Sequence, residues 1–330
     1  MIRKPEKTIS IQEIEAASQI IRSGGLVAFP TETVYGLGAN ALDAKAVAQI
    51  FVVKERPAFD PLIVHICQLN DLFNLCKEVD DRALILANVF WPGPLTIILP
   101  KSDLIPSLVT SGLPDVAVRM PNHEVALKLI EAAGCPIAAP SANKFGKLSP
   151  TNAVHVRKQL PEVNCILDGG NCSVGLESTV VKLNDDGFVI LRHGAITESM
   201  LLQYVPKSSG KNINPLPEAS PGLMKSHYSP EKRVYIIGEH TIPEDTSDAA
   251  LVNFHLSHYQ GFKIVENLSK DGDLMEAAEN LFQILHQLED QDISFLVVEP
   301  VPEIGIGIAI MDRLRKAAFR FHNDIEMIKE

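Results

Sequence analysis

Short apolar runs alternate with segments of helical periodicity along most of the chain, and this alternation restricts the possible folds more than any other feature. Strand-like runs occupy residues 62–66 (LIVHI), 95–99 (LTIIL) and 116–120 (VAVRM). Apolar residues at helical spacing predict helices over residues 84–90 and 122–133. Because strands that alternate with helices form a sheet covered by helices, the sequence predicts a mixed α/β fold.

Capping signals mark the ends of two N-terminal helices. Ser10 begins a capping-box pattern (SIQE) before apolar residues at helical spacing, and Gly24-Gly25 is a typical helix end. A strand at residues 26–29 follows, and Asp43 is placed to cap a second helix that reaches Lys54. We therefore expect a helix, a strand and a second helix at the start of the chain.

The same signals predict the rest of the N-terminal region. Asn122 is placed to cap the helix that ends near Ala133. The turn sequence NDDG at residues 184–187 predicts an antiparallel hairpin. The other expected elements are an extended segment at 136–140, a helix at 149–160 and a strand that meets a turn at 165–170.

The chain has 330 residues, which exceeds the usual size of a single hydrophobic core, so we expect two domains. Residues 207–232 contain Ser208-Ser209-Gly210, several prolines and little periodicity, which is typical of a linker. A second α/β pattern starts after them. The predicted organisation is an α/β domain over 1–206, the linker over 207–232 and a smaller α/β domain over 233–330.

The composition is that of an ordinary globular protein, with 46% hydrophobic and 22% charged residues. No apolar run is long enough to span a bilayer, and the N-terminal MIRKPEKTIS lacks the apolar core of a secretory signal. We therefore expect a cytoplasmic protein. The five cysteines form no CxxC pair and are odd in number, which disfavours a disulfide framework or a zinc site and favours reduced thiols.

The net charge of −11 argues against a generic nucleic-acid binder, but its distribution is uneven. Residues 1–205 carry 18 Lys and Arg against 21 Asp and Glu, so −8 of the −11 falls on the remainder of the chain. The N-terminal part can therefore still contain a local basic pocket.

Polar clusters stand where the predicted elements end. The stretch GLVAFPTETVYGLGANA at residues 25–41 ends a strand in hydroxyls, a carboxylate and two glycines, which exceeds what a plain turn requires. Further clusters are KERPAFDPL, VAVRMP, APSANKFGKLSPT and GLESTVVKL with LRHG. Ligands gather at strand ends in open α/β sheets. Arg56, Arg119 and Arg192 together with these hydroxyls suit a polyanion such as a nucleoside triphosphate.

Simpler interpretations exist for individual residues. Lys54 and Arg56 also fit solvated charges at a helix C-terminus, where the helix dipole favours them. Ser141-Ala142-Asn143 also fits a simple turn, and His65 fits a core histidine. The chain contains no GxxxxGK[ST] loop, no GxSxG elbow and no metalloprotease histidine pair. The residues alone therefore predict an α/β pocket for an anionic ligand.

The motifs together resemble the threonylcarbamoyl-AMP synthase family, the YrdC-like proteins. GLVAFPTETVYGLGANA, KERPAFDPLIVH, WPGPLT, VAVRMPNH, APSANKFGKLSPT and GLESTVV…LRHGAI occur in the family's order. PGLMKSHYSP resembles the linker of the family's long form, and GIGIAIMDRLRKAAF resembles the end of its C-terminal domain. The resemblance implies a YrdC-like twisted mixed sheet with helices and a second, smaller Rossmann-like α/β domain.

The resemblance also implies a nucleotidyl transfer. L-threonine and bicarbonate or CO2 form N-carboxy-threonine, which attacks the α-phosphate of ATP to give threonylcarbamoyl-AMP and pyrophosphate. A downstream tRNA threonylcarbamoyl transferase complex then transfers the threonylcarbamoyl group to an adenosine of tRNA, so the chain would meet tRNA only indirectly and no membrane. The implied cofactor is Mg²⁺ that arrives with ATP, with no tightly bound organic cofactor and no metal-ligating side chains identified.

Site residues carry over from the family position by position. The threonine site would comprise Thr33, His65, Arg119, Ala139 and Ser178, with Arg119 suited to the carboxylate. The catalytic residues would be Lys54, Arg56, Ser141 and Asn143, which match the family's KxR and SxN elements. ATP would contact Arg56, Asp60, Asp115, Ser141, Ser149, Arg192 and Tyr228. Because cations stabilise charge that develops on phosphates, we expect Arg56→Ala to cost more activity than stability.

Two positions depart from the family's pattern. Asp60 stands where the family usually has Asn, and Asp115 where it often has Thr. A carboxylate near phosphate should weaken nucleotide binding unless Mg²⁺ or a cation compensates. The linker is expected to fold over the active site, because a passive tether requires neither His227 nor Tyr228. Tyr228 is then placed to hydrogen-bond the nucleotide.

Two other functions compete with this interpretation. The first is the carbamoyl-adenylating domain of an O-carbamoyltransferase-like enzyme, which would need a second catalytic domain that uses carbamoyl phosphate. The second is a non-enzymatic module that binds double-stranded RNA through shape and charge, against which the net charge speaks.

Overall fold

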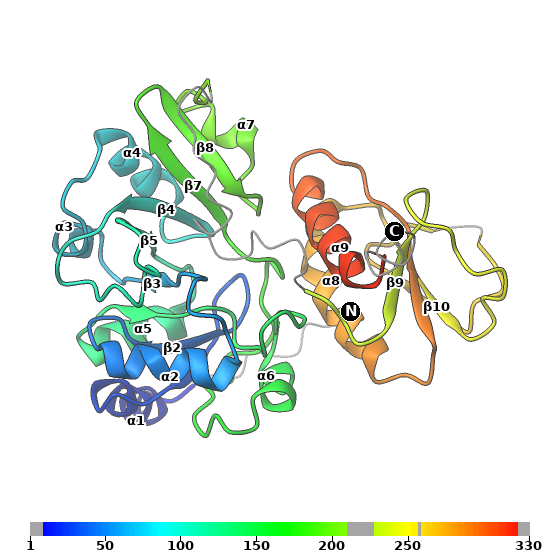
Figure 1. Ribbon diagram of the computed structural model, residues 1–330, viewed down its shortest axis with the longest axis horizontal. Helices are drawn as coiled ribbons and strands as arrows, with labels where there is room; N and C mark the ends of the chain where they lie inside the picture. The colour runs from blue at the N-terminus through cyan, green and yellow to red at the C-terminus, as the bar shows by residue number, and fades with distance from the viewer. Residues whose placement is uncertain (1–8, 210–227, 257–258, 323–330) are drawn as a thin grey trace, which may run out of the picture.

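The computed structural model describes residues 9–209, 228–256 and 259–322, which form two α/β units (Figure 1). The first unit contains an eight-stranded mixed sheet, and the second contains a four-stranded parallel sheet. The predicted fold class, a mixed sheet with helices plus a smaller α/β domain, is confirmed.

The first unit extends from α1 to α7. Its strands are β1 (Val27–Phe29), β2 (Gly36–Asn40), β3 (Ile63–His65), β4 (Leu95–Pro100), β5 (Asp115–Arg119), β6 (Ile137–Ala138), β7 (Thr179–Asn184) and β8 (Gly187–Arg192). Its helices are α1 (Ile11–Arg22), α2 (Ala44–Lys54), the 3-10 turn η1 (Leu69–Asp71), α3 (Leu72–Leu75), α4 (Asp81–Phe90), α5 (Glu124–Ala133), α6 (Ala153–Gln159) and α7 (Glu198–Leu201).

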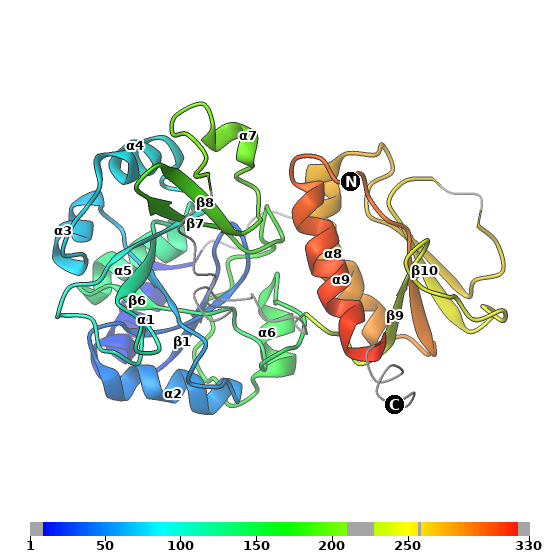
Figure 2. The same ribbon diagram turned by 45° about the horizontal axis from the view of Figure 1, so that its top comes forward.

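The second unit contains β9 (Arg233–Ile236), β10 (Ala249–Asn253), β11 (Ile264–Asn267), α8 (Leu274–Glu289), β12 (Phe295–Val298) and α9 (Gly307–His322). Its strand order is β11-β10-β12-β9, and all three pairings are parallel. Helices α8 and α9 lie between this sheet and the first unit in both views (Figures 1 and 2).

Strand register in the first sheet brings polar residues together. The order is β1-β2-β6-β3-β5-β4-β7-β8. The parallel neighbours β3 and β5 pair His65 with Arg119, and β6 follows on the other side of β3. Gly36 at the start of β2 forms a bridge with Ser141, which follows β6. Segments that are distant in the sequence therefore meet on one part of the sheet.

The predicted caps at the first two helices are confirmed. The Ser10 side chain accepts a hydrogen bond from the Glu13 backbone, and the Glu13 carboxylate accepts one from the Ser10 backbone in return. The Asp43 carboxylate accepts hydrogen bonds from two backbone amides at the start of α2. The hairpin of β7 and β8 also forms around its predicted turn.

Three predicted boundaries are wrong. Helix α5 begins at Glu124, and its capping side chain is His123 rather than Asn122. The helix expected from residue 149 begins only at Ala153, because Pro150 disfavours helical backbone at the preceding residue and Asn152 supplies the cap. The segment 165–170 forms a single bridge with β1 instead of a full strand.

Strands β2 and β11 were not expected from the sequence. In β2 the glycines of GLGAN serve packing, because a Cβ atom on Gly38 would lie 2.7 Å from both Ile137 Cγ2 and Phe29 Cε1. Only a residue without a side chain allows the ring of Phe29 and the side chain of Ile137 to meet over this strand. Gly38 is therefore required by the packing of the sheet.

The two units share a hydrophobic core. Leu148, Leu176 and Tyr228 pack into the core cluster that α8, α9 and the second sheet form. Gly175, which has a φ of +75°, allows close approach, since a Cβ there would lie 2.5 Å from the Ala278 carbonyl oxygen on α8. The helices of the second unit thus pack directly against the first unit.

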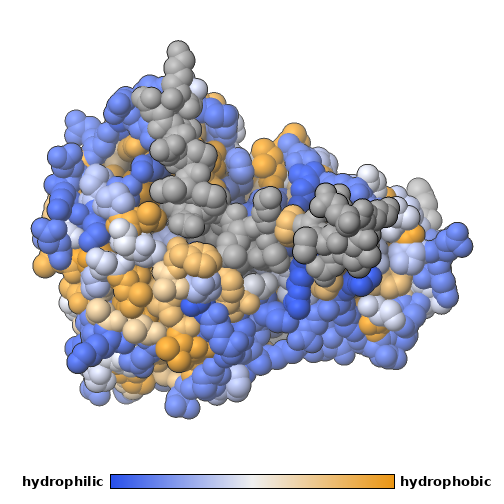
Figure 3. Space-filling model, in the orientation of Figure 1, coloured by the Kyte–Doolittle hydropathy of each residue, from blue (hydrophilic) through white to orange (hydrophobic). Residues whose placement is uncertain are grey.

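The surface differs between the two units. On the face shown in Figure 3, apolar residues gather over the lower part of the first unit, whereas the second unit is mainly hydrophilic. The second unit belongs to the acidic part of the chain, so this surface fits its composition. Within the described residues, no helix is both long enough and apolar enough to cross a membrane.

The packing of β2 predicts a graded response to alanine. Gly38→Ala should lower the free energy of unfolding by about 1–3 kcal/mol, because its Cβ overlaps two rigid apolar side chains. Gly36→Ala is the matched control on the same strand, since its nearest neighbour would be Ala139 Cβ at 3.2 Å. Urea unfolding measures both variants, and a Gly38→Ala protein at least as stable as Gly36→Ala would contradict this packing.

Candidate functional site

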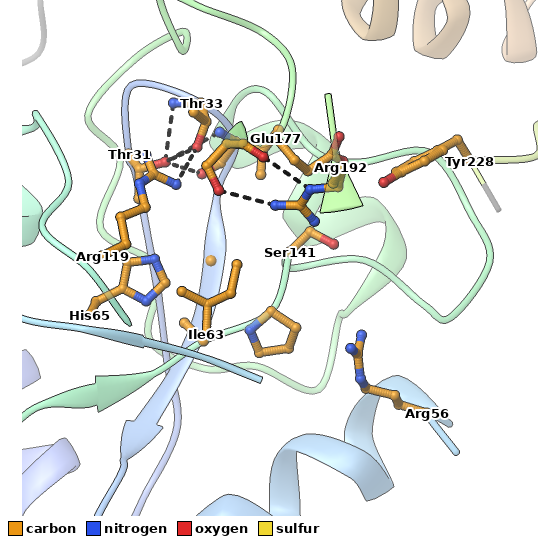
Figure 4. A pocket seen from close by; sticks show the side chains of 15 residues that line it. Thr31, Thr33, Arg56, Ile63, His65, Arg119, Ser141, Glu177, Arg192 and Tyr228 are labelled. Carbon is orange, nitrogen blue, oxygen red and sulfur yellow. Dashed lines mark hydrogen bonds between the residues drawn. The ribbon is translucent and has the colours of Figure 1, made fainter. Parts of the chain in front are cut away.

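One cavity of the first unit gathers most of the predicted site residues (Figure 4). Of those predicted, Thr33, Arg56, His65, Arg119, Ala139, Ser141, Ser178, Arg192 and Tyr228 line it. All five residues predicted for threonine are in this group, together with four of those predicted for ATP. Thr31, Val34, Gly36, Ile63, Pro140 and Glu177 complete the lining.

Arg119 is a buried cation at one end of the cavity. Its Nη1 donates to Thr33 Oγ1 at 2.9 Å, and its Nε donates to the Gly93 carbonyl at 3.2 Å. Its Nη2 approaches Glu32 Oε2 to 2.7 Å, which is an ion pair without hydrogen-bond geometry. A charge shielded from water requires such partners, so Glu32 and Thr33 together replace the lost hydration of the Arg119 guanidinium.

The polar run after β1 is ordered by its own hydroxyl groups. Thr31 Oγ1 donates to the Val34 carbonyl at 2.7 Å and lies 2.8 Å from Thr33 Oγ1. The backbone amide of Thr33 donates to Thr31 Oγ1 at 3.2 Å. The hydroxyls therefore fold the turn and hold Thr33 against Arg119.

His65 lies beside Arg119 in a dry environment. Its side chain is buried, and its ring stands edge-on to Phe29 with centroids 6.0 Å apart. Burial, with a smaller contribution from the Arg119 charge, lowers the pKa of His65 to about 3. The ring is therefore neutral near pH 7, and it adds no charge beside Arg119.

Arg56 and Asp60 form a buried ion pair. Arg56 Nη2 lies 2.8 Å from Asp60 Oδ1, and the guanidinium also donates to the carbonyls of Asp60 and Pro61. Burial raises the pKa of Asp60, while Arg56 opposes that rise. Asp60 thus has its compensating cation, and its effect on a phosphate is smaller than that of an unpaired carboxylate.

Lys54 lies behind the cavity wall rather than in it. Its side chain is only 1% exposed, and its Nζ donates to the carbonyls of Ser141 and Asn143. Asn143 is also buried, and its amide donates to the carbonyls of Lys144 and Lys147. The interpretation of Lys54 and Arg56 as solvated helix-end charges is therefore wrong, because both side chains point into the protein. Lys54 and Asn143 shape the loop that presents Ser141.

Ser178 and Arg192 meet at another side of the cavity. Arg192 Nε donates to the Ser178 carbonyl at 3.0 Å, and its Nη2 donates to Ser178 Oγ at 3.0 Å. Ser178 Oγ also lies 2.7 Å from Thr96 Oγ1. The hairpin of β7 and β8 brings Arg192 to this position, and Ser178 immediately precedes β7.

Glu177 adds a buried carboxylate to the lining. Its Oε1 accepts a hydrogen bond from Ser149, and its Oε2 accepts one from Arg313 Nε at 3.0 Å. Burial opposes ionisation, yet the charges of Arg313 and Arg192 hold the pKa of Glu177 below its usual value. Ser149 itself is fully buried, so it reaches the cavity through Glu177.

Tyr228 closes the cavity from the second unit's side. Its side chain is 1% exposed, and its hydroxyl end points toward the cavity (Figure 4). The centroids of the Tyr228 and Phe282 rings are 5.6 Å apart, and the Tyr228 backbone has a φ of +60°. His227 lies outside the described residues.

Asp115 is not part of the cavity. It lies four residues before Arg119 at the other end of β5, where it pairs with Lys182 at 2.7 Å. Alternation along a strand places both residues on the same face of the sheet. Its predicted contact with ATP would therefore require a ligand that extends along the strand.

Sequence reasoning missed three charged residues of the site. Glu32 and Glu177 lie inside motifs that were interpreted through their hydroxyl groups and arginines, although a buried arginine calls for a carboxylate partner. Arg313 lies in the second unit, and its contact with Glu177 depends on how the two units pack. No spacing rule in the sequence indicates that contact.

The described residues contain no group of three or more His, Cys, Asp or Glu side chains that could hold a metal ion. Mg²⁺ at nucleotide sites usually binds substrate phosphates and one or two carboxylates rather than a complete protein cage. Glu177 is a carboxylate in the cavity wall, although Arg313 and Ser149 already bind it.

Comparison with known proteins accounts for both units. Residues 19–194 match the family model described as Telomere recombination, which is named for Sua5, YciO and YrdC. Residues 196–319 match the family model described as Threonylcarbamoyl-AMP synthase, C-terminal domain.

Individual relatives match over nearly their full length. A threonylcarbamoyl-AMP synthase of Pyrococcus abyssi is 42% identical, over 93% of this chain and 94% of the relative. A protein of the same name from Bacillus subtilis is 40% identical, over 93% of each chain. The crystal structure of P. abyssi Sua5 complexed with L-threonine has a TM-score of 0.84 at 40% identity, covering 94% of this chain and 96% of that chain.

The buried pair of Arg56 and Asp60 means that Arg56→Ala should also cost stability, in addition to the larger loss of activity expected from the sequence. Removing the guanidinium leaves Asp60 as an uncompensated buried charge, which should lower the free energy of unfolding by about 3–5 kcal/mol. The double variant Arg56→Met with Asp60→Asn should recover most of this loss. Denaturant unfolding measures both.

A matched control for this test is Arg82→Ala, because Arg82 and Asp80 form a similar ion pair that is partly exposed. Its removal should cost no more than about 1 kcal/mol. If Arg56→Ala were no more destabilising than Arg82→Ala, the ion pair would not be the structural element that we describe.

Proposed function

The chain belongs to the Sua5/YrdC family of threonylcarbamoyl-AMP synthases, and from this premise we propose that it makes threonylcarbamoyl-AMP and pyrophosphate from L-threonine, bicarbonate or CO2 and ATP. The product serves threonylcarbamoyladenosine modification of tRNA. The observation that carries the proposal is one cavity in which three buried arginines surround hydroxyl groups and a small apolar wall. The enzyme is thus a nucleotidyltransferase.

L-threonine occupies the end of the cavity near Arg119. A carboxylate can accept hydrogen bonds from the planar guanidinium of Arg119, which Thr33 holds in place. Ala139 and neutral His65 offer a small wall for the methyl group, and Ser178 offers a hydroxyl. This site fits an amino acid with a short side chain. The P. abyssi relative crystallised with L-threonine supports the assignment.

ATP occupies the end formed by Arg56, Ser141 and Arg192. Fixed guanidinium groups near the phosphates stabilise the charge that develops as the α-phosphate reacts. They act without reorganising, because Asp60 and Ser178 already hold Arg56 and Arg192 in place. Ser141 is presented by a loop that Lys54 ties down from behind.

The reaction joins two anions, so the site must offset their repulsion. The threonine amine adds to CO2 and forms a carbamate. A carbamate oxygen then attacks the α-phosphorus of ATP, the bond to the bridging oxygen breaks, and pyrophosphate leaves. Arg119 fixes the threonine while Arg56 and Arg192 fix the nucleotide, which lowers the entropic cost of their encounter. Mg²⁺ bound to ATP would supply further charge neutralisation at the phosphates.

The end of the linker, at Tyr228, covers part of the site, whereas residues 210–227 lie outside the described residues. Tyr228 forms part of the cavity lining and is buried against the second unit. A lid that excludes water would protect an adenylate from hydrolysis until a downstream tRNA threonylcarbamoyl transferase complex receives it. In this arrangement the chain meets tRNA only through that complex.

The competing functions have less support. A carbamoyl-adenylating domain of an O-carbamoyltransferase-like enzyme would need a second catalytic domain, whereas residues 196–319 match the C-terminal domain of threonylcarbamoyl-AMP synthases. A double-stranded-RNA module requires an exposed basic surface. Arg56, Arg119 and Arg192 are instead buried inside the fold.

Pyrophosphate release from ATP should require both L-threonine and bicarbonate. L-serine lacks the methyl group that meets the cavity wall, so it should support a rate at least about ten times lower. A coupled pyrophosphate assay measures this, with carbamoyl phosphate in place of threonine and bicarbonate as the test of the rival enzyme. Equal rates with L-serine, or with no amino acid, would contradict the assignment of threonine.

Tyr228→Ala in the full chain should raise the KM for ATP by about ten-fold or more, because it removes a wall of the cavity. Tyr228→Phe separates the ring from the hydroxyl and should show a smaller change. Tyr235→Ala is the matched control, since Tyr235 packs against Phe295 within the second unit. Steady-state kinetics with unchanged KM and kcat for Tyr228→Ala would mean that the linker is only a tether.

A further inference from the structure

Arg313 reaches from the second unit to the wall of the cavity. It lies on α9 and its side chain is 0% exposed, although arginine is almost never fully buried without a partner. Its Nε donates to Glu177 Oε2 at 3.0 Å, and its Nη1 donates to Asp312 at 2.8 Å. Its guanidinium carbon also lies 5.3 Å from the centre of the Tyr228 ring.

We infer that Arg313 is a positioning residue for the nucleotide end of the site, acting through Glu177 and Tyr228. The inference rests on the proposed function, because it assigns ATP to that end of the cavity. Arg313 does not line the cavity itself. The second unit would thereby control ATP binding through one side chain.

Charge balance is the first argument. Four buried guanidinium groups surround the cavity or its wall: Arg56, Arg119, Arg192 and Arg313. The carboxylates buried among them are Asp60, Glu32 and Glu177. Without Arg313 the three carboxylates would equal the three remaining guanidinium groups in number, and Glu177 would keep only the Ser149 hydrogen bond and the Arg192 charge as compensation. Asp312 does not cancel Arg313, because Lys316 lies 3.0 Å from Asp312 Oδ1.

Hydrogen bonding is the second argument. Glu177 binds Arg313 with one carboxylate oxygen and Ser149 with the other, which leaves the carboxylate in a fixed orientation. The carbonyl of Ser149 lies 3.1 Å from His286 Nε2 on α8. The position of Ser149 thus depends on the second unit in two ways. Its hydroxyl binds Glu177, which Arg313 on α9 holds, and its carbonyl lies against His286 on α8.

Packing on Tyr228 is the third argument. The ring contacts both the guanidinium of Arg313 and the ring of Phe282, which belong to the second unit. A cation over an aromatic face attracts the ring and fixes its plane. Arg313 therefore controls the direction in which the Tyr228 hydroxyl enters the cavity.

Stability alone does not account for this arrangement. A buried ion pair often contributes no more than well-packed apolar residues of similar volume would contribute. If Arg313 were needed only to join the two units, its replacement by methionine would therefore change only the free energy of unfolding and would leave ligand binding unchanged. Replacing a positioning residue must also change the affinity for the ligand that it helps to bind.

The test compares Arg313→Met, Arg313→Lys, Glu177→Gln and the double variant Arg313→Met with Glu177→Gln in the full chain. The control is Arg315→Met, because Arg315 lies on the same helix but bridges Glu239 and Glu303 at the surface. The readouts are the Kd of a non-hydrolysable ATP analogue by calorimetry, the separate KM values for ATP and L-threonine, and thermal unfolding.

We expect Arg313→Met to weaken ATP-analogue binding at least ten-fold and to change the KM for L-threonine less than two-fold. Arg313→Lys should weaken ATP-analogue binding less than Arg313→Met does, since lysine keeps the positive charge but lacks the planar guanidinium. Arg313→Met should weaken ATP-analogue binding less in the Glu177→Gln background than in the wild type, because the two residues act together. The double variant also removes both buried charges and keeps the test valid if Arg313→Met alone unfolds.

The inference is overturned if Arg313→Met binds the analogue as the wild type does, or if it raises both KM values equally. Additive effects of Arg313→Met and Glu177→Gln would also overturn it. Analogue binding needs no turnover, so the result stands apart from the proposed function. An enzyme that binds ATP but releases no pyrophosphate with threonine and bicarbonate would disprove the function and still report on Arg313.

Discussion

The site depends on holding guanidinium charges where water is excluded. A buried charge is tolerated only when an opposite charge or hydrogen-bonding groups replace its lost hydration. Arg119 has Glu32 and Thr33, Arg56 has Asp60, and Arg192 has Ser178. These partners fix each cation before any ligand arrives. Anions that enter therefore meet groups already oriented, in surroundings where electrostatic attraction is stronger than in bulk water.

The fold supplies these pairs from distant parts of the chain. The parallel pairing of β3 with β5 puts His65 opposite Arg119, and the hairpin of β7 and β8 brings Arg192 to Ser178. Tyr228 at the end of the linker lines the cavity and packs against α8 and α9 of the second unit. Each unit alone would leave polar groups of this wall without partners. The active site is thus a property of the two units together.

Much of this could be predicted from the sequence, because helix caps, strand runs and motif residues are local signals. The caps at Ser10 and Asp43 are examples. Local signals fail where tertiary packing decides. The cap of α5 is His123 and not the predicted Asn122. The contact between Glu177 and Arg313 joins residues that are 136 positions apart in the sequence. Motifs identified the arginines, but only packing shows which carboxylate each one needs.

We propose that the buried arginines are the groups that bind the substrate anions. Calorimetric titration of the wild-type protein with L-threonine and with L-threoninamide tests it most directly, because the amide keeps the side chain but lacks the carboxylate that Arg119 is placed to bind. We expect L-threonine to bind at least ten times more tightly than L-threoninamide, since a charge-assisted hydrogen bond to a buried arginine is lost with the amide. Equal affinity for the two ligands would contradict it.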